Sequence, residues 1–292
     1  MSKLTGYAIP TGILDTDHTY VKSDNPPYSW GCWGRDDGGT AICEGYGNAS
    51  ISNCISQVLP VAGIAYAVNG VCHQTANRIL YPARVIVSKA RGYGASSYLY
   101  GDYGGMIIPN PFTRIFIPDP FWPIIINKCH AGLTSKLESK TEVDLENTPE
   151  SQYIKRIQDL YSNVEYMATD SNHNELREKA NDLIIKNFEY LIEFHLGDKV
   201  DSHITNQTQK QQIDVLKEKD KKVEELFNRD ISTEKYVKEV NDLIADNLIS
   251  LQESLGKNIY EKIFNLPASK NRFVLIDPEI AEKSLKTYLN YK

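Results

Sequence analysis

The sequence lacks the features of a membrane protein, a secreted protein or a nucleic-acid-binding protein. Its 292 residues contain no run of about 18 apolar residues, so we expect no membrane span. The formal charge of −6 argues against nucleic acid as a partner, because neutralising phosphates requires basic clusters. The opening residues, MSKLTGYAIPTG, have no apolar signal region. We therefore expect a cytoplasmic protein, with non-classical export as the alternative.

Cysteine is scarce, and its spacing limits what it can do. The five cysteines are Cys32, Cys43, Cys54, Cys72 and Cys129, and no two of them form the close pair that is typical of zinc sites. We therefore predict no metal ligands and no cofactor, with a structural zinc site as a competing interpretation. Because the number is odd, at least one thiol must stay free, and in a reducing compartment we expect all five to be reduced.

Glycine, proline, tryptophan and cysteine are almost missing from the second half of the chain. Residues 1–135 hold 16 of the 18 Gly, 10 of the 13 Pro and all three Trp, with 9 basic and 8 acidic residues. Residues 136–292 hold 23 basic and 30 acidic residues. The first composition is typical of short strands and tight turns, and the second of helices. We predict an α+β domain over 1–135 and an all-α helical bundle over 150–292, with the boundary near 133–150.

Apolar residues recur at helical spacing throughout the second half. The periodic stretches are 150–168, 174–196, 207–228, a helix from Ser232 to Gly256, a short turn at 260–264, and a last helix after Asp277. Their apolar stripes predict a bundle of about five helices packed against each other. Because no chemical constellation occurs in this half, we interpret it as an accessory bundle that docks a protein partner.

The first half alternates strand and turn signals. The expected elements are strands at 17–21, 28–35, 40–44 and 62–68, and a short helix at 52–59. The Gly- and Tyr-rich stretch 89–105 is expected to form a mobile loop or a strand pair that covers the candidate site described below. The Pro- and aromatic-rich stretch 108–123 is expected to pack against the helical half.

The most informative segment is 69–80, NGVCHQTANRIL. A strand ends at a Gly-containing turn, and Cys72 stands where a helix should begin. A thiol at a helix N-terminus lies at the positive end of the macrodipole, close to unpaired N–H groups, and both favour the nucleophilic thiolate. The same N–H groups could stabilise an oxyanion. His18, on an earlier strand, could supply the base.

The two segments 17–21, DHTYV, and 69–80 resemble the papain-like cysteine hydrolase superfamily. A His on a strand before a Cys on a helix is similar to the circularly permuted NlpC/P60 group, which includes LRAT-like acyltransferases. The resemblance covers residues 15–82. It implies that Cys72 is the nucleophile and His18 the base, acting on an amide, thioester or ester carbonyl. We favour a peptidase or amidase, with a peptide, peptidoglycan-like or acyl substrate.

Further residues could support the pair. The candidate supporting side chains are His73, Gln74, Asn77 and Tyr20. Tyr20 should share the strand face of His18, because side chains alternate along a strand. His130 is an alternative base with Asn127 as its orienter, but the strands that should follow it are missing, so we favour His18. The strand 28–35 offers no standard third catalytic residue.

A non-enzymatic interaction protein is the alternative function. In that interpretation a β-rich head binds a ligand, helped by a structural zinc, and the helical half docks a partner. The two hypotheses differ in one feature. An enzyme needs a hydrogen-bonded Cys–His pair in a cleft, whereas a binding module tolerates a buried Cys72 and a distant His18.

Overall fold

A computed structural model of the chain describes most of its residues. The described ranges are 1–32, 35–58, 62–104, 107–109, 116–118, 129–130, 148–162, 173–197, 200–268 and 273–289. Two sequence expectations fall largely outside them. Asn127, the orienter suggested for His130, and most of the stretch 108–123 lie in residues that the structure does not describe.

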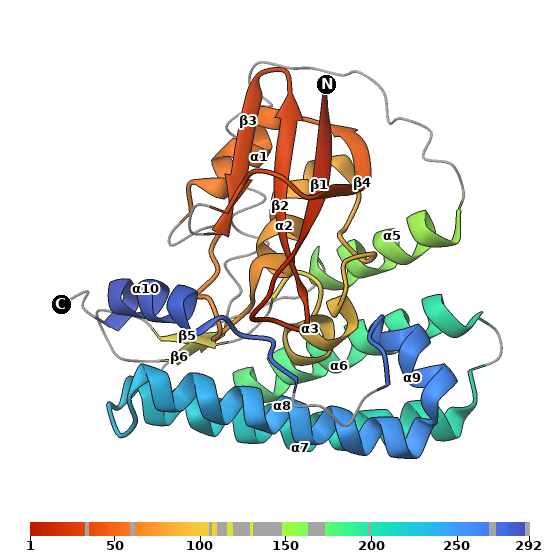
Figure 1. The fold of residues 1–292 in the computed structure, drawn as a ribbon, viewed down its shortest axis with the longest axis vertical. Coiled ribbons are helices and arrows are strands. Elements are labelled where there is room, and N and C mark those ends of the chain that lie inside the picture. The colour runs from red at the N-terminus through yellow and green to blue at the C-terminus, as the bar shows by residue number, and fades with distance from the viewer. Residues whose placement is uncertain are drawn as a thin grey trace.

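Four antiparallel strands form the sheet of the first half (Figure 1). They are β1 (Ser2–Pro10), β2 (Asp17–Asp24), β3 (Pro27–Gly31) and β4 (Thr40–Gly47), in the order β3-β2-β1-β4. Strand β1, which was not among the predicted strands, lies in the middle and alternates buried with partly exposed residues. Its inward positions are Leu4, Gly6 and Ala8, so small side chains let the neighbouring elements come close.

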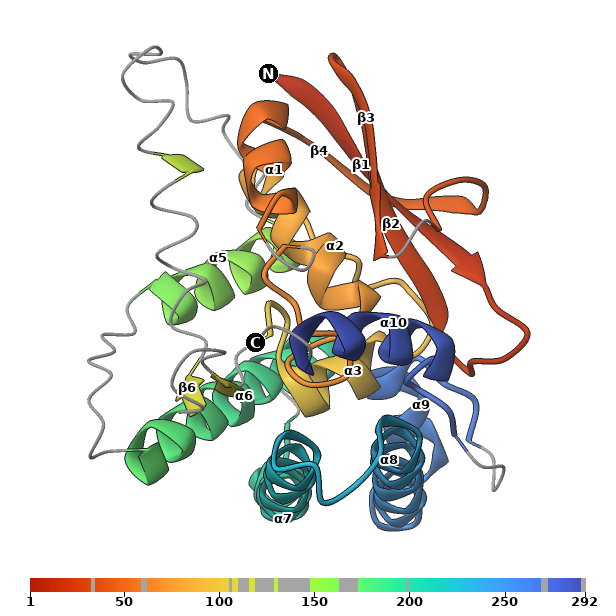
Figure 2. The same ribbon diagram turned by 90° about the vertical axis from the view of Figure 1, so that its left-hand side faces the viewer.

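Two helices cover one face of this sheet (Figure 2). Helix α1 (Ala49–Ser56) is capped by Asn48, whose side chain accepts hydrogen bonds from the N–H groups of Ser50 and Ile51. Helix α2 (Cys72–Leu80) has all nine residues buried. It is followed by a single 3-10 turn, η2 (Tyr81–Ala83). The helix predicted to begin at Cys72 is therefore confirmed.

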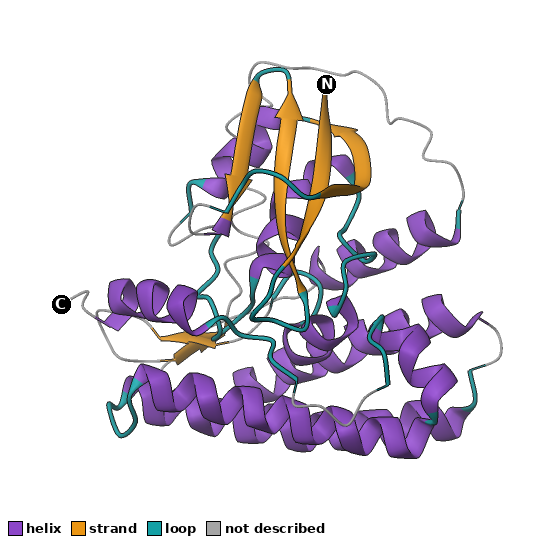
Figure 3. Ribbon diagram, in the orientation of Figure 1, coloured by secondary structure: helices purple, strands orange, loops and turns teal. Residues whose placement is uncertain are grey.

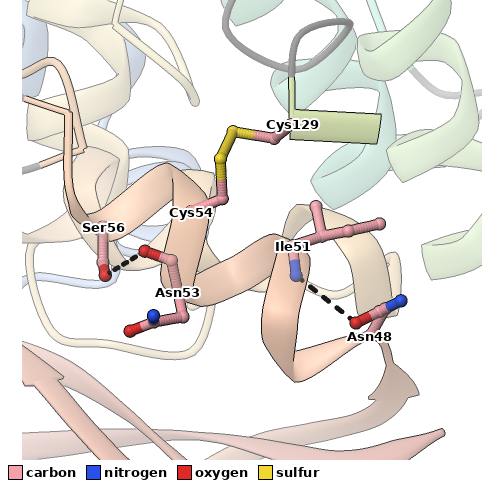
Figure 4. Close-up of a disulfide and its surroundings, with 6 residues drawn as sticks. All are labelled: Asn48, Ile51, Asn53, Cys54, Ser56 and Cys129. Carbon is pink, nitrogen blue, oxygen red and sulfur yellow. Dashed lines mark hydrogen bonds between the residues drawn. A yellow bond between two sulfur atoms is a disulfide. The ribbon is translucent and has the colours of Figure 1, made fainter. Parts of the chain in front are cut away.

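A disulfide joins α1 to a later part of the chain (Figure 4). Cys54 is bonded to Cys129 across 75 residues of sequence. The expectation that all five cysteines are reduced is therefore wrong. Cys32, Cys43 and Cys72 remain as free thiols. Spacing alone could not predict this pair, because a disulfide depends on which segments the fold brings together.

The stretch 62–68 is not the strand that its apolar residues predict. It forms turns with one isolated bridge, between Tyr66 and Gly70. Ala62 has φ of +50° and Ala67 has φ of +72°, and a strand cannot contain such left-handed positions. The apolar side chains are buried, so the run reflects a buried turn.

The stretch 89–105 contains a buried helix, and the prediction of a mobile loop or strand pair there is wrong. Helix α3 (Tyr93–Tyr100) has all eight residues buried. It contacts α2 on one side and the helices of the second half on the other. A Cβ on Gly94 would lie 2.4 Å from the carbonyl oxygen of Ile263, so only glycine permits this close approach.

In the described part of the second half, the regular elements are helices joined by loops (Figure 3). Its helices are α5 (Pro149–Ser162), α6 (His173–Leu196), α7 (Ser202–Phe227), α8 (Thr233–Leu255), α9 (Lys257–Phe264) and α10 (Pro278–Leu289). The predicted start at Ser232 and stop at Gly256 are confirmed as the caps of α8. Short strands β5 (Ile107–Pro109) and β6 (Phe116–Pro118) pair beside α6.

The two halves share one hydrophobic core. A single cluster of buried residues runs from Leu4 in the sheet to Leu285 in the last helix. The α+β fold class is confirmed, with an antiparallel sheet and a large helical portion. Of the predicted boundary near 133–150, residues 133–147 lie outside the described residues. Among the described helices, none is both long and apolar enough to cross a membrane.

Candidate active site

Cys72 is the first residue of α2. The preceding residue, Val71, is extended, and its N–H donates to the side-chain oxygen of Gln74 at 3.0 Å. Within the described residues, no group accepts a hydrogen bond from the backbone N–H of Cys72 or His73. The thiol therefore lies at the positive end of the helix macrodipole, next to N–H groups that are free to bind an anion.

His18 is held near the start of β2. It pairs with Ile9 of β1, and the residue before it, Asp17, is anchored on both sides. The N–H of Asp17 donates to the carbonyl of Arg91 at 3.0 Å, and its carboxylate accepts from the N–H of Arg91 at 2.9 Å. This exchange fixes the start of the strand against the segment that leads into α3.

The structure brings Cys72 and His18 together. They lie close enough for each to shift the pKa of the other, and the Cys72 thiol also donates to the backbone carbonyl of Asp17 at 3.9 Å. The His18 Nε2 lies 2.7 Å from the backbone carbonyl oxygen of Arg35, in the loop between β3 and β4. A carbonyl only accepts, so Nε2 carries a proton and Nδ1 is the nitrogen available to the thiol. The carbonyl of Arg35 thus orients the His18 ring. In the sequence analysis no side chain could be assigned to this role of third catalytic group.

The electrostatics of the pair favour charge separation. Burial alone would raise the pKa of Cys72, but the hydrogen bond to His18 and the charge of that ring bring it below its ordinary value. Burial would lower the pKa of His18, but the bond to Cys72, its charge and the carbonyl of Arg35 raise it. Both shifts favour a thiolate facing an imidazolium.

Thr19 and Cys32 complete the surroundings of the sulfur. The N–H and the hydroxyl of Thr19 also lower the pKa of Cys72. The Thr19 hydroxyl is buried and has no hydrogen-bond partner among the described residues. The thiol of Cys32 donates to the hydroxyl of Thr75 at 3.1 Å, one turn along α2 from Cys72. Thr19 could not be predicted as part of the site, because a threonine next to a histidine on a strand is common.

The candidate supporting residues of α2 have structural partners. His73 lies with Nε2 2.9 Å from the carbonyl oxygen of Asp17 and with Nδ1 2.7 Å from the hydroxyl of Ser96. Burial lowers its pKa to about 4, so the ring is neutral. Gln74 caps its own helix and donates to the carbonyl of Gly101 at 2.8 Å. These contacts hold α2 in place.

Asn77 and Tyr20 also lie away from the thiol. Asn77 donates to the hydroxyl of Tyr93 and to the carbonyl of Asp102, both at 2.8 Å. Tyr20 stacks on Tyr7, and its hydroxyl donates to the carbonyl of Gly38 at 2.5 Å. Tyr20 therefore fastens the β3–β4 loop that also carries the Arg35 carbonyl.

The alternative base His130 lies in a different environment. It follows Cys129, which is bonded to Cys54 of α1. Its Nε2 is buried without a hydrogen-bond partner among the described residues, and burial lowers its pKa. The groups that shift the pKa of Cys72 include His18 and do not include His130.

The pair is enclosed but borders an open pocket. Cys72 is 3% exposed and His18 is 2% exposed. A surface pocket of about 450 Å³ lies beside them. Its lining includes Ile9, which pairs with His18, and Arg35, whose carbonyl binds the ring. The lining of this pocket contains neither Cys72 nor His18, so it borders the pair through these two neighbours.

The described residues contain no cluster of three or more metal-ligating side chains. Comparisons of the chain with models of protein families, with curated proteins and with solved structures found no match.

Proposed function

We propose that the protein is a cysteine hydrolase or acyltransferase, with Cys72 as nucleophile and His18 as base. The observation that carries the proposal is the juxtaposition of Cys72 and His18, which shift each other's pKa, with the His18 ring oriented by the carbonyl of Arg35 at 2.7 Å. A nucleophile bonded to a base that a third group orients is the arrangement of a thiol enzyme.

Each step of the reaction has a group to perform it. The Cys72 thiolate attacks the carbonyl carbon of the substrate, and the oxygen becomes an oxyanion. The backbone N–H groups of Cys72 and His73, at the start of α2, stabilise that charge. The His18 imidazolium then protonates the leaving amine or alcohol. Finally, neutral His18 activates a water, or an acceptor hydroxyl or amine, to release the acyl group from the thioester.

The neighbouring pocket suggests a chain-like substrate. It is lined by apolar groups, Ile9, Pro10 and Ile13, on one side and by charged residues of the β3–β4 loop on the other. We favour a peptide or peptidoglycan-like amide over an acyl ester, in keeping with the resemblance to the permuted NlpC/P60 group.

The test is the rate of iodoacetamide alkylation at Cys72 against pH, read by mass spectrometry. We expect fast labelling that persists below about pH 7, and at least a tenfold fall at about pH 6.5 in His18→Ala. Cys43 is an internal control, because burial raises its pKa to about 12 and it should label only slowly at neutral pH. Slow labelling of Cys72 that His18→Ala leaves unchanged would exclude the proposal.

A panel of peptide, peptidoglycan-fragment and acyl-ester substrates then defines the reaction. Cys72→Ala should abolish turnover completely, because it removes the attacking atom. His18→Ala should lower kcat by about two to four orders of magnitude. A thermal unfolding curve of this variant checks that it is folded.

The burial of the pair favours a second candidate, a non-enzymatic interaction protein with a β-rich head and a helical docking half. With 3% of Cys72 exposed, a substrate reaches the sulfur only if the surrounding residues move. In that case Cys72 labels no faster than Cys43.

The Cys54–Cys129 disulfide is typical of an oxidising compartment, which favours export over the cytoplasmic expectation.

A further inference from the structure

A second buried thiol lies beside Cys72, and the proposed mechanism does not use it. Cys32 directly follows β3 and is 2% exposed. Strand β3 pairs antiparallel with β2, with Gly31 opposite Tyr20. Continuing this register by one residue sets Cys32 beside Thr19, whose N–H and hydroxyl act on the Cys72 sulfur. The strand register thus brings both thiols to the same residue.

Helix α2 places the two thiols together independently. The Cys32 sulfur lies 3.1 Å from the hydroxyl oxygen of Thr75. Thr75 follows Cys72 by three residues, and side chains at that spacing share a helix face with Cβ atoms about 5–6 Å apart. Burial and then the charge of Cys72 raise the pKa of Cys32, which is the electrostatic sign of the same proximity.

We infer that Cys32 is a resolving thiol for Cys72, so that a hydroperoxide converts the two into an intramolecular disulfide and reversibly blocks the nucleophile. The inference rests on the proposed function, because it needs Cys72 to be an activated thiolate.

The chemistry balances in two steps. The Cys72 thiolate attacks one peroxide oxygen, so that an S–O bond forms, the O–O bond breaks, and the ring proton of His18 leaves with the hydroxide as water. The sulfur is oxidised to a sulfenic acid and the peroxide is reduced. The Cys32 sulfur then attacks the sulfenic sulfur, an S–S bond forms, and the S–O bond breaks. The thiol proton of Cys32 and the departing hydroxide form a second water. An external dithiol reverses the disulfide by exchange.

Two features of the site suit this sequence of events. Hydrogen peroxide is little larger than water, so it can reach the buried Cys72 sulfur with less movement of the surrounding residues than a peptide requires. While Cys72 is a thiolate, its charge helps to keep Cys32 protonated. Oxidation to a neutral sulfenic acid removes that charge, so one of the two causes that raise the pKa of Cys32 is lost once Cys72 has reacted, and burial remains.

Cys43 is a matched control on the same sheet. It is also a free thiol, lies on β4 opposite Gly6, and does not contribute to the pKa shifts of Cys72. The test treats the full-length wild type, Cys32→Ser and Cys43→Ser with hydrogen peroxide. Trypsin and chymotrypsin then separate the peptides that contain Cys32, Cys43 and Cys72 for mass spectrometry.

We expect the wild type to lose the mass of two hydrogen atoms and to yield a Cys32–Cys72 linked peptide that dithiothreitol removes. In Cys32→Ser, Cys72 should instead gain two or three oxygen atoms, with at least about tenfold more of these forms than in the wild type. Cys43→Ser should behave as the wild type, and thermal unfolding of each variant confirms that it is folded.

Two outcomes overturn the inference and can be told apart. If Cys72 of the wild type is oxidised to sulfinic acid without a link to Cys32, Cys72 is still an activated thiolate, as the proposed function requires. Only the resolving role of Cys32 is then excluded. If Cys72 reacts with neither peroxide nor iodoacetamide, the inference and the proposed function fail together.

Discussion

His18 and His73 lie on either side of Cys72, and their surroundings drive them to opposite protonation states. His18 faces a sulfur that carries negative charge, and its pKa is raised despite burial. His73 is buried between a carbonyl and a hydroxyl, and burial together with the positive charge of His18 lowers its pKa to about 4. Sequence proximity to the cysteine is therefore a poor guide to which histidine can act as its base.

The depressed pKa of His73 makes the fold acid-sensitive. An unfolded histidine has a pKa of 6.5, so between that value and about 4 the unfolded chain binds the extra proton. The stability that His73 contributes is complete above pH 6.5 and is lost as the pH falls toward 4, at up to about 1.4 kcal/mol per pH unit. Urea unfolding at several pH values should show this loss, and His73→Gln should reduce it.

His195, whose pKa is also lowered to about 4, adds a loss of the same sign that His73→Gln leaves in place. NMR titration provides an independent reading of the wild type. The ring signals of His73 should not shift as the pH falls from 7 to about 5. A titration of His73 near its ordinary value would contradict the prediction.

Residues differ in how far the sequence reveals them. Cys72 could be predicted at the start of a helix, because a Gly turn and an apolar face mark that junction. The group that orients His18 could not be predicted, because it is the main-chain carbonyl of Arg35. Every residue has such a carbonyl, so the amino-acid sequence does not single it out. The sequence indicated Cys32 only as a possible metal ligand. Its position beside Thr75 could not be predicted, because it depends on the strand register.

Helix α3 depends on another element to complete its C-terminus. The last carbonyls of a helix lack partners within it. Here the side chains of α7 supply two of them, because Gln212 donates to the carbonyl of Tyr98 at 2.7 Å and Lys219 donates to that of Leu99 at 2.8 Å. The Lys219 nitrogen also lies 4.9 Å from the ring centre of Tyr100. The interface between α3 and α7 thus contains a buried amine.

Burial lowers the pKa of Lys219 to about 7, although the charge of Asp220 opposes the shift. Between about 7 and the ordinary value of 10.5, the unfolded chain binds more protons than the folded chain. The contribution of Lys219 to stability is complete above pH 10.5 and is lost as the pH falls to about 7. From pH 7 to 9, the wild type should gain about 2 kcal/mol relative to Lys219→Met.

Chemical denaturation of both proteins at each pH measures this difference. Lys217→Met is the matched control, because Lys217 lies on the same helix with an exposed side chain. It should follow the wild type at every pH. A difference between wild type and Lys219→Met that does not change with pH would show that the amine stays charged in the folded protein.

Amphipathic elements were predictable and fully buried ones were not. Helices α5 to α10 each present one apolar face, and that periodicity is visible in the sequence. Helix α3 is buried on all sides, so it has no polar face. Its run of Tyr, Gly and Ser therefore shows no alternation of apolar and polar residues at helical spacing. Strand β1 was missed because its inward positions, Leu4, Gly6 and Ala8, are mostly small.

At the scale of the whole molecule, one buried carboxylate connects the two halves. Asp102 accepts a hydrogen bond from Ser97 at 2.7 Å within the first half. From the second half, the hydroxyl of Tyr153 donates to it at 2.5 Å, and the Asn187 side chain accepts from its N–H at 2.8 Å. The compositional division between the halves is real, but it does not coincide with a division of the core.

Removal of the Tyr153 hydroxyl tests this connection. In Tyr153→Phe the buried carboxylate of Asp102 loses a partner, and a hydrogen bond to a charged group contributes about 1.5–3 kcal/mol. We expect the free energy of unfolding to fall by about that amount in a single cooperative transition, measured by urea unfolding with fluorescence and circular dichroism.

Tyr260→Phe is the matched control, because Tyr260 is buried on α9 and only burial shifts its pKa. It should change stability by less than about 0.5 kcal/mol. Equal effects of the two substitutions, or two separate transitions in Tyr153→Phe with the spectroscopic probes disagreeing, would contradict a shared core.

The contact between His18 and the carbonyl of Arg35 has a consequence for mutational scanning. Every side-chain substitution at position 35 keeps the oxygen that orients the ring, so an alanine scan would record the position as tolerant. The same oxygen would be lost from its place if a proline or a deletion changed the path of the β3–β4 loop. Homologues could therefore vary freely at residue 35 while preserving the length of the loop, and an insertion or deletion there would mark the loss of activity.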